Sequence, residues 1–330
     1  MSVKSRPLGK TGLSVSEVGF GCWGIGGLVP GASYGETDDN QSLRALARAA
    51  EKGITFFDTA PAYGNGHSER LLGTAFGNRA DVTIATKAGQ DQFDWPVDFS
   101  AGAIRRGVEA SLGRLRRERI DLLQLHNPTI DILKAKPEIL GTLDDLKREG
   151  KVREVGLSLK APGEAAAAIK DLGARVVQVN FNLIDHRAID SGLFDLVATS
   201  GAGLIARTPL AFGMLAGEAP ATQSFAPGDH RANWAKDRLA LWANEGRAMA
   251  SDIAARDEQP LPQIAIRFCL SWDAVSAVIP GMLSPAEVDE NTKASTAGRL
   301  APFDLAKIRN QYAKSALSGP PAGSSRASST

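Results

Sequence analysis

The sequence predicts an α/β fold in which eight strands and their intervening helices close into a (β/α)8 barrel, or TIM barrel. Eight short runs of β-branched and apolar residues recur along the 330-residue chain, and stretches with helical spacing of apolar residues separate them. The 34 glycines suit a fold with many tight turns. Alternating strands and helices imply a parallel sheet with right-handed crossovers, and eight such units close naturally into a barrel.

The predicted strands follow one another in order. They lie at 15–21 (VSEVGFG), 54–58 (ITFFD), 82–87 (VTIATK), 120–126 (IDLLQLH), 152–158 (VREVGLS), 176–180 (VVQVN), 203–207 (GLIAR) and 275–281 (VSAVIPG). Helical spacing marks residues 38–53, 103–118 and 138–151. In the first of these segments we expect Gly53 to end the helix and one face to be buried, formed by Leu43, Leu46, Ala47 and Ala50.

One domain is expected over residues 1–317, because barrels of about 250 residues or more form single units. A long loop follows the seventh predicted strand, from Gly213 to about Trp234, before helical spacing resumes near Ala235. Such loops are usually functional, for instance as a lid over an active site, and a plain surface insertion is the alternative. Residues 318–330 (SGPPAGSSRASST) lack periodicity and are expected to form a flexible tail.

Composition restricts the class of partner. The chain has 38 Lys and Arg against 37 Asp and Glu, so its net charge of +1 argues against a nucleic-acid binder and favours a small-molecule partner. The two cysteines, Cys22 and Cys269, show no metal-ligand spacing and fit a reducing cytoplasm. No run approaches the roughly 20 apolar residues that a membrane-spanning helix needs. The sequence does not indicate an oligomeric state.

Polar or conformationally unusual residues stand at the carboxyl ends of the predicted strands. They are Asp58, Lys87, His126, Ser158, Gln178 with Asn180, Arg207, and the pair Pro280-Gly281. In a closed barrel these ends meet at one face, where barrel enzymes place their chemistry. A carboxylate such as Asp58 at the end of a buried strand costs on the order of several kcal/mol unless a positive group meets it. We expect Lys87 to be that group.

The set Asp58, Tyr63, Lys87 and His126 suits proton transfer. A tyrosine hydroxyl, with an ordinary pKa near 10, is a weak donor at neutral pH. A lysine ammonium about 4 Å away attracts the phenolate by roughly 4 kcal/mol at an effective dielectric constant near 20, so we expect the pKa of Tyr63 to fall by about one to three units. His126 would aim a substrate carbonyl at the phenol through a ring N–H. Each residue alone has a structural explanation, but the four together do not.

Three segments resemble the aldo-keto reductase superfamily. FFDTAPAYGNGHSERLLG (56–73) resembles its segment around the catalytic Asp and Tyr, IATKAG (84–89) its Lys segment, and DLLQLHNP (121–128) its His segment. The resemblance covers about 6–291 and implies a barrel that binds NAD(P)H in extended form without a Rossmann domain. It implies reduction of aldehydes or ketones, or the reverse, with Tyr63 as general acid/base, Lys87 and Asp58 tuning it, and His126 orienting the carbonyl.

The resemblance also assigns the cofactor site. Ser158 and Gln178 match positions that hold the nicotinamide carboxamide, the stretch 210–215 lies near the pyrophosphate, and Glu290 and Asn291 match adenine contacts. The full expected set is Gly21, Cys22, Trp23, Asp58, Ser158, Gln178, Arg207, Thr208, Leu210, Gly213, Leu215, Gly281, Leu283, Glu287, Glu290 and Asn291.

Two departures from the family pattern bear on the cofactor. Leu159 replaces an asparagine that normally shares the carboxamide, and Arg207 stands where many members have a tyrosine that stacks on the nicotinamide. A guanidinium there would favour the reduced cofactor, because the oxidised ring carries a like charge. NADPH-preferring members commonly have Lys or Arg where this chain has Gly281, Leu283 and Glu287, so the sequence favours NAD(H), unless Arg231 compensates.

The expected substrate contacts are Trp23, Tyr63, Trp95, His126, Phe225 and Trp234. Aromatic walls beside polar groups suit a sugar, a polyol or a small aldehyde. Two other functions stay open. One is a barrel lyase in which Lys87 forms a Schiff base, although a neighbouring Asp58 that keeps the amine protonated counts against it. The other is an interaction protein that binds NADPH, like the reductase-related subunits of potassium channels.

Overall fold

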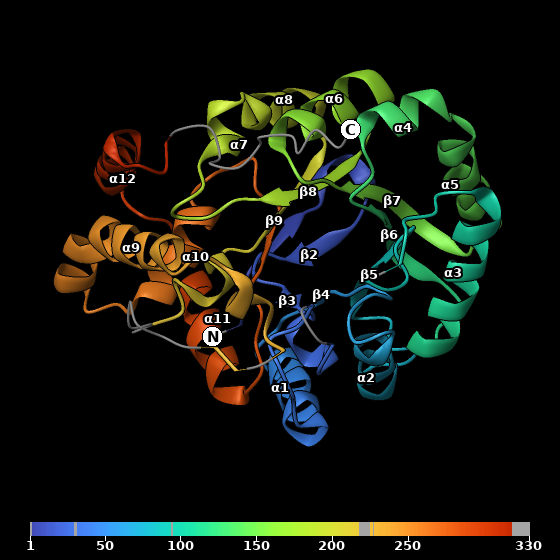
Figure 1. Ribbon diagram of the computed structural model, residues 1–330, viewed down its shortest axis with the longest axis horizontal. Helices are drawn as coiled ribbons and strands as arrows, with labels where there is room; N and C mark the ends of the chain where they lie inside the picture. The colour runs from blue at the N-terminus through green and yellow to red at the C-terminus, as the bar shows by residue number, and fades with distance from the viewer. Residues whose placement is uncertain (1, 30–31, 94, 218–224, 227, 319–330) are drawn as a thin grey trace.

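The computed structural model describes residues 2–29, 32–93, 95–217, 225–226 and 228–318. Its centre is an eight-stranded parallel sheet in which each strand pairs with its neighbours in the sequence. Parallel bridges from Val18 to Val278 and from Gly21 to Gly281 bring the first strand against the last, so the sheet curls into a barrel (Figure 1). The strands are β3 (Phe20–Gly21), β4 (Phe56–Asp58), β5 (Thr83–Ala88), β6 (Ile120–His126), β7 (Val152–Ser158), β8 (Val176–Asn180), β9 (Gly203–Arg207) and β10 (Ala277–Ile279).

Helices surround the barrel and connect its strands (Figure 1). They are α1 (Asp39–Glu51), α2 (His67–Ala75), α3 (Ala101–Leu115), α4 (Ile130–Ala135), α5 (Glu138–Arg148), α6 (Pro162–Leu172), α7 (Arg187–Asp190), α8 (Leu193–Ser200), α9 (Lys236–Asp257), α10 (Leu261–Leu270), α11 (Pro285–Ala297) and α12 (Pro302–Lys314). Helical structure therefore occupies each of the three segments that the sequence predicts. No helix in the described ranges is both long enough and apolar enough to span a membrane.

Local chemistry sets the limits of α1. The Asp38 side chain accepts hydrogen bonds from the backbone N–H groups at positions 40 and 41, and Gly53 beyond the last turn has a φ of +86°. The predicted buried face is wrong in one respect, because Ala47 is exposed. The buried stripe is centred on Ala45, Leu46 and Ala49 instead.

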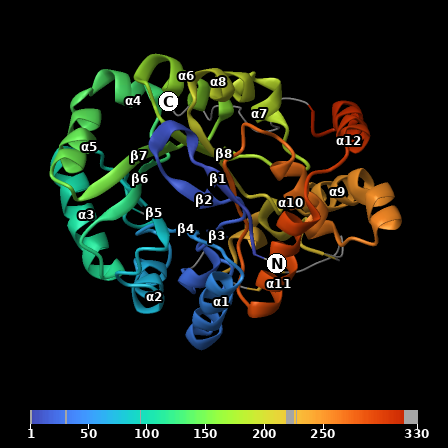
Figure 2. The ribbon, with the colours of Figure 1, turned by 180° about the vertical axis from the view of Figure 1, so that it is seen from behind.

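The first predicted strand, 15–21, is wrong as a single strand. Residues Ser14–Ser16 form β2, which pairs antiparallel with β1 (Ser5–Pro7), and the chain enters the barrel only at β3. This hairpin lies across one end of the barrel (Figure 2). Its Leu8, Leu13 and Val15 join a buried cluster with inward-facing strand residues such as Phe56 and Leu122. Burial of this apolar surface closes that end of the barrel and leaves the carboxyl ends of the strands for the site.

The long loop after β9, the seventh barrel strand, contains two short 3₁₀ helices, η3 (Ala211–Gly213) and η4 (His230–Asn233), and α9 then begins near the predicted position. The backbone N–H of His230 donates to the Ser33 carbonyl at 2.9 Å, so this part of the loop contacts the loop that follows β3. Residues 218–224 and 227 lie outside the described residues, as does the predicted tail from residue 319 on. The function of the loop as a lid stays a prediction.

Candidate active site

The predicted strand-end residues converge on one cavity. Pairing register places His126 beside Ser158, Ser158 beside Gln178, and Asn180 beside Arg207. The cavity has a volume of about 240 Å³. The predicted residues that line it are Gly21, Cys22, Trp23, Asp58, Tyr63, His126, Gln178, Asn180, Arg207, Thr208 and Gly281. Lys87 and Ser158 are not part of the lining, but they hydrogen-bond to Tyr63 and Gln178, which are.

The Lys87 ammonium connects the site. Its Nζ donates to Asp58 Oδ1 at 2.5 Å, to the Thr59 carbonyl at 2.8 Å and to the Tyr63 hydroxyl oxygen at 3.2 Å. Because an ammonium has three protons and no lone pair, these three bonds use all of its donors. The Tyr63 oxygen must therefore accept from Lys87, and its own proton is left to donate to a group in the cavity.

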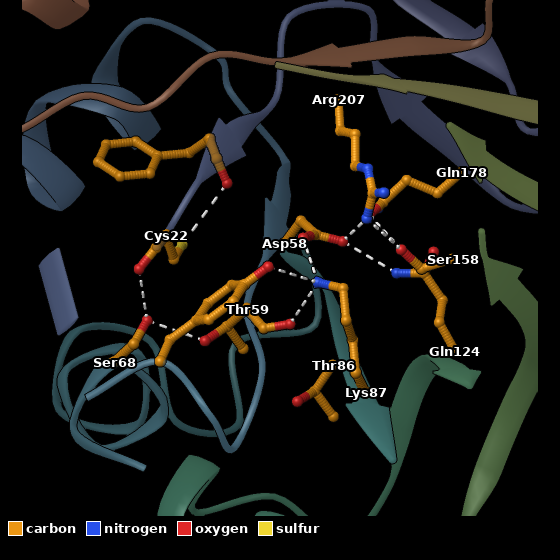
Figure 3. A network of polar contacts seen from close by, with 12 residues as sticks. Cys22, Asp58, Thr59, Ser68, Thr86, Lys87, Gln124, Ser158, Gln178 and Arg207 are labelled. Atoms are coloured by element: carbon orange, nitrogen blue, oxygen red, sulfur yellow. Dashed lines mark hydrogen bonds and ion pairs between the residues drawn. The ribbon is translucent and has the colours of Figure 1, made fainter. Parts of the chain in front are cut away.

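Asp58 is held by donors from three strands (Figure 3). Its Oδ1 accepts from Lys87, and its Oδ2 accepts from Gln124 Nε2 at 2.9 Å and Gln178 Nε2 at 2.7 Å. Asp58 is 2 % exposed and Lys87 is 1 % exposed. Burial is the largest single influence and alone would lower the pKa of Lys87, but Asp58 and Tyr63 together, through charge and hydrogen bonds, raise that pKa above its ordinary value. The expected partner of Asp58 is confirmed as Lys87.

The expected fall in the pKa of Tyr63 is wrong for the site as it stands. Burial raises that pKa above its ordinary value, and the Lys87 ammonium lowers it only in part. The ammonium attracts the phenolate, but placing a phenolate in a buried pocket has a larger cost, and the residue types alone do not reveal that burial. Tyr63 is thus a neutral phenol at neutral pH, which is the protonation state of a general acid.

His126 is a neutral imidazole at the end of β6. Burial, together with the positive charges of Lys87 and Arg207, lowers its pKa well below the ordinary value. Its Nδ1 is buried and has no hydrogen-bond partner among the described residues. The ring packs edge-on against Tyr63, with centroids 6.1 Å apart. A neutral ring keeps one N–H and one lone pair, so it can hold a substrate oxygen beside the phenol without adding a charge.

Ser158 and Gln178, which are expected to hold the nicotinamide carboxamide, are hydrogen-bonded to each other. Ser158 Oγ donates to Gln178 Oε1 at 3.0 Å, and Arg207 donates to Ser158 Oγ at 3.1 Å (Figure 3). The guanidinium also donates to Asn180 Oδ1 at 2.7 Å, to Asn127 Oδ1 at 3.3 Å and to the Leu159 carbonyl at 3.1 Å. These acceptors fix the positively charged Arg207 guanidinium at the cavity wall.

The wall of the cavity is aromatic, and it contains only some of the residues that the sequence predicts as substrate contacts. The indole of Trp23 lies 5.9 Å from the ring of Phe93, 4.9 Å from Tyr34 and 6.3 Å from Phe212, and all four residues line the cavity. The sequence analysis missed three of them, as it missed Asn127. Phe93 lies two residues before Trp95, so the predicted segment reaches the cavity through Phe93 rather than through Trp95.

Three predicted substrate contacts do not line this cavity. Trp95 is 55 % exposed. Trp234 packs on Phe212 with ring centroids 5.0 Å apart, one layer behind the wall. Phe225 lies under the Arg231 guanidinium, 4.3 Å from the ring centroid.

The segment expected to hold adenosine lies beyond β10. The Glu287 carboxylate accepts from the Leu283 backbone N–H at 2.6 Å at the start of α11. Glu290 accepts from Gln263 Nε2 at 2.8 Å, and Asn291 is buried. On the other side, Leu210 and Leu215 are buried, and Gly213 adopts a φ of +94° beside the Arg231 guanidinium. Within the described ranges, no cluster of three or more His, Cys, Asp or Glu side chains is suited to a metal ion.

The family model for the aldo/keto reductase family matches residues 17–313. The chain belongs to this family. A solved aldo-keto reductase of Bacillus halodurans, in its holo form, is 29 % identical in sequence, and the superposition covers 94 % of this chain and 96 % of that one with a TM-score of 0.76. The chain is also 29 % identical over 302 residues to L-galactose dehydrogenase of Arabidopsis thaliana, covering 89 % of this chain and 88 % of that protein.

A third relative is the NADH-specific methylglyoxal reductase of Escherichia coli (strain K12). It is 28 % identical over 309 residues, which is 88 % of this chain and 93 % of that protein. Aldo-keto reductases are oxidoreductases that use NAD(P)H. The cavity of this aldo-keto reductase fits the nicotinamide end of such a cofactor. Gly281 lines the cavity without a side chain, and a Cβ there would be in van der Waals contact with the Gly21 carbonyl oxygen at 3.9 Å. The polar residues Arg207, Asn127 and Asn180 line the same cavity.

Proposed function

We propose that this aldo-keto reductase reduces an aldehyde or ketone to the alcohol, or catalyses the reverse, with Tyr63 as the general acid or base. The observation that carries the proposal is the hydrogen bond from Lys87 to the Tyr63 oxygen at 3.2 Å. Since Lys87 can only donate, the Tyr63 proton is free for a carbonyl oxygen in the cavity. Bound NAD(P)H supplies the hydride that goes to the carbonyl carbon.

The other three residues support that proton transfer. As Tyr63 gives up its proton, negative charge forms on its oxygen, next to an ammonium that is already in place. Asp58 keeps Lys87 protonated, and the donors from Gln124 and Gln178 hold Asp58 in position. The neutral His126 would donate its N–H to the substrate oxygen and keep it beside the phenol.

We infer a preference for NAD(H). The Glu287 carboxylate is fixed on the Leu283 backbone, where its negative charge would oppose a 2′-phosphate. Arg231, the residue that was expected to be able to compensate, is engaged by Asp229 at 2.7 Å and by the Phe212 carbonyl at 3.1 Å. Similarity to an NADH-specific reductase supports the same preference.

The substrate we propose is a small aldehyde, a sugar or a polyol. Rings of Trp23, Tyr34, Phe93 and Phe212 form the wall, and a relative acts on L-galactose. A cavity of about 240 Å³ limits the size of the group that reaches Tyr63. The reductase function is favoured over a Schiff-base lyase because Lys87 is protonated and all three of its donors are used, whereas a nucleophilic amine needs a free lone pair. A binding protein without turnover would not need these four groups to be aligned.

The test is a panel of aldehydes, ketones, sugars and polyols assayed with NADH and NADPH, and with the oxidised cofactors for the reverse reaction. We expect turnover with at least one carbonyl, and a fall of about 10² to 10⁴ in kcat for Tyr63→Phe with cofactor binding unchanged. Full activity of Tyr63→Phe would contradict the proposed acid. A hundredfold preference for NADPH would contradict the cofactor assignment alone. Trapping of a substrate on Lys87 by borohydride would favour the lyase.

A further inference from the structure

A groove between α2 and α3, separate from the active-site cavity, is lined by arginine side chains. Two hollows of about 260 and 610 Å³ adjoin there and share Ala110 and Arg114. Arg106 lines the first hollow, and Arg70 and Arg116 line the second. We call these two hollows together the α2–α3 groove.

The floor of the α2–α3 groove is formed by small residues of α3. Gly107, Ala110 and Gly113 all line it and are spaced three residues apart, so they share one helix face. Larger side chains on this face would fill the space between the two helices. The groove is therefore an elongated trench with cationic side chains along its length rather than a round pocket.

Positive charge in the α2–α3 groove exceeds the negative charge available to it. Arg70, Arg106 and Arg116 are exposed and form no ion pair within the described part of the chain. The acidic side chains on the walls are Asp39, Glu109 and Asp91. His67 hydrogen-bonds to Asp39 at 2.7 Å, and Lys151 forms an ion pair with Glu109. Two carboxylates, those of Asp39 and Asp91, are therefore left to face three arginines that form no ion pair in the described part of the chain.

The fourth arginine is already paired inside the protein. Arg114 Nε donates to Oε2 of Glu69 at 2.6 Å, and Glu69 is fully buried. A Cβ placed on Gly66 would lie 2.8 Å from Arg114 Nε and 3.3 Å from a terminal nitrogen of Arg70, so the two guanidinium groups flank the same glycine. Two like charges thus stand near the same glycine, and the Glu69 carboxylate pairs with only one of them, an arrangement that an added anion would stabilise.

The amino end of α2 adds to this field. Asn65 and Gly66 line the first hollow, and Gly66 at the helix start supplies no side-chain cap. The positive end of the helix dipole is therefore directed at the same groove as the arginines.

We propose that the α2–α3 groove binds a small polyphosphate, such as inorganic triphosphate or the phosphate chain of a nucleotide. Arginine is the side chain best suited to phosphate, because its planar guanidinium donates two parallel hydrogen bonds to phosphate oxygens. Arginines distributed along a trench match several linked phosphates better than one. The site is distinct from the proposed cofactor site at the mouth of the barrel.

The groove lies close to the catalytic residues. Oε1 of Glu69 accepts from the Thr86 hydroxyl at 2.6 Å, and Thr86 precedes Lys87 in β5. Any anion that draws Arg114 toward the groove would weaken its hold on Glu69. Arg114 is unsuitable for a binding test, because its replacement would leave the buried Glu69 carboxylate without a counter-charge.

The test is calorimetric titration of the full chain with inorganic triphosphate at physiological salt, with NADH saturating so that the barrel mouth is occupied. We expect one binding site, and a loss of at least about tenfold in affinity for the double variant Arg70→Ala/Arg106→Ala. The matched control is Arg153→Ala, an exposed arginine on β7, which should bind as the wild type does. Thermal unfolding and NADH binding of each variant confirm that the fold is intact.

Three results would overturn the proposal. They are the absence of binding by the wild-type chain, equal affinity in the double variant, and displacement of the triphosphate by NADH, which would place it in the cofactor site. A peptide of consecutive glutamates that binds tighter than triphosphate, and that loses affinity in the double variant, would assign the groove to an acidic protein segment instead.

Discussion

The reacting end of the cavity and its entrance are built from different parts of the chain. At the reacting end, Asp58 and Lys87 project from paired strands, and every donor of the ammonium has an acceptor. At the entrance, Trp23, Phe93 and Phe212 come from loops after β3, β5 and β9, and they contact one another through ring packing. In the proposed function, the strands therefore hold the proton-transfer groups, and the loops supply the aromatic wall that selects the substrate.

The largest effect is expected at the reacting end, from Asp58→Asn. The change removes the counter-charge of a lysine that is 1 % exposed, so it should lower the free energy of unfolding by about 3–5 kcal/mol. The pKa of Lys87 should fall because the main attraction that opposes burial is then lost, and we expect kcat to drop by about 10² or more. Urea unfolding and steady-state kinetics measure the two effects.

A matched control is Asp171→Asn, which breaks the exposed pair with Lys134. Exposed pairs contribute little, so this variant should stay within about 1 kcal/mol of the wild type. Equal losses in the two variants would mean that the buried pair has no special importance.

Lowering the pH should destabilise the protein through three buried histidines, one at the reacting end, one behind the entrance and one elsewhere. Burial lowers the pKa of His126, at the reacting end, and of His230, behind the entrance, and it lowers the pKa of His186 to about 3. The unfolded chain takes up these protons below a pH of about 6.5 and the folded chain does not, so stability is complete above that pH and falls below it.

For each histidine whose pKa in the folded protein lies well below 5, the free energy of unfolding should fall by up to about 2 kcal/mol as the pH is lowered from 6.5 to 5. Urea unfolding at several pH values measures the slope. His186→Gln keeps a donor for the Leu183 carbonyl and an acceptor for Arg309, and it should flatten the slope. A slope that is the same in this variant would contradict the assignment.

The entrance should affect substrate affinity more than turnover. Phe93→Ala removes a ring from the cavity wall, and we expect KM to rise by about tenfold with kcat nearly unchanged. Trp95→Ala, two residues later and 55 % exposed, serves as the control and should leave both constants unchanged. If Trp95→Ala had the larger effect on KM, the wall would be the one that the sequence predicted.

The smallest effect concerns Arg207, which lies between the two regions. Its fixed charge should disfavour the oxidised nicotinamide, so Arg207→Tyr should lower the ratio of the dissociation constant for NAD⁺ to that for NADH by several-fold, on the order of 1 kcal/mol. Cofactor titrations by fluorescence measure both constants. An unchanged ratio rejects this role.

The sequence predicts the reacting end of the cavity better than its entrance. Asp58, Lys87 and His126 stand at the ends of periodic apolar runs, and barrel geometry brings such ends together whatever the loops do. Seven of the eight predicted ranges each hold one barrel strand and no other strand, to within one residue. The exception, 15–21, fails because part of that run pairs with Ser5–Pro7 in a hairpin, and an apolar run does not reveal its partner.

The loop residues could not be chosen from local sequence. Phe93 and Trp95 are equally aromatic and stand in one segment, and only the path of the backbone turns the first toward Trp23. The predicted fall in the pKa of Tyr63 is wrong for a related reason. A neighbouring charge can be expected from a motif, but the depth of burial that opposes it depends on packing from the whole barrel.

The most direct test of the central claim is the ionisation of Tyr63, followed by phenolate absorbance as the difference between the wild-type chain and Tyr63→Phe. In the absence of cofactor we expect its pKa to lie above 10 and to rise further in Lys87→Met, because the one positive charge that lies within hydrogen-bond distance of the Tyr63 oxygen in the described part of the chain is then lost. A Tyr63 pKa that does not change when Lys87 is replaced would contradict the account, since the ammonium would then have no hold on the proton that the reaction needs.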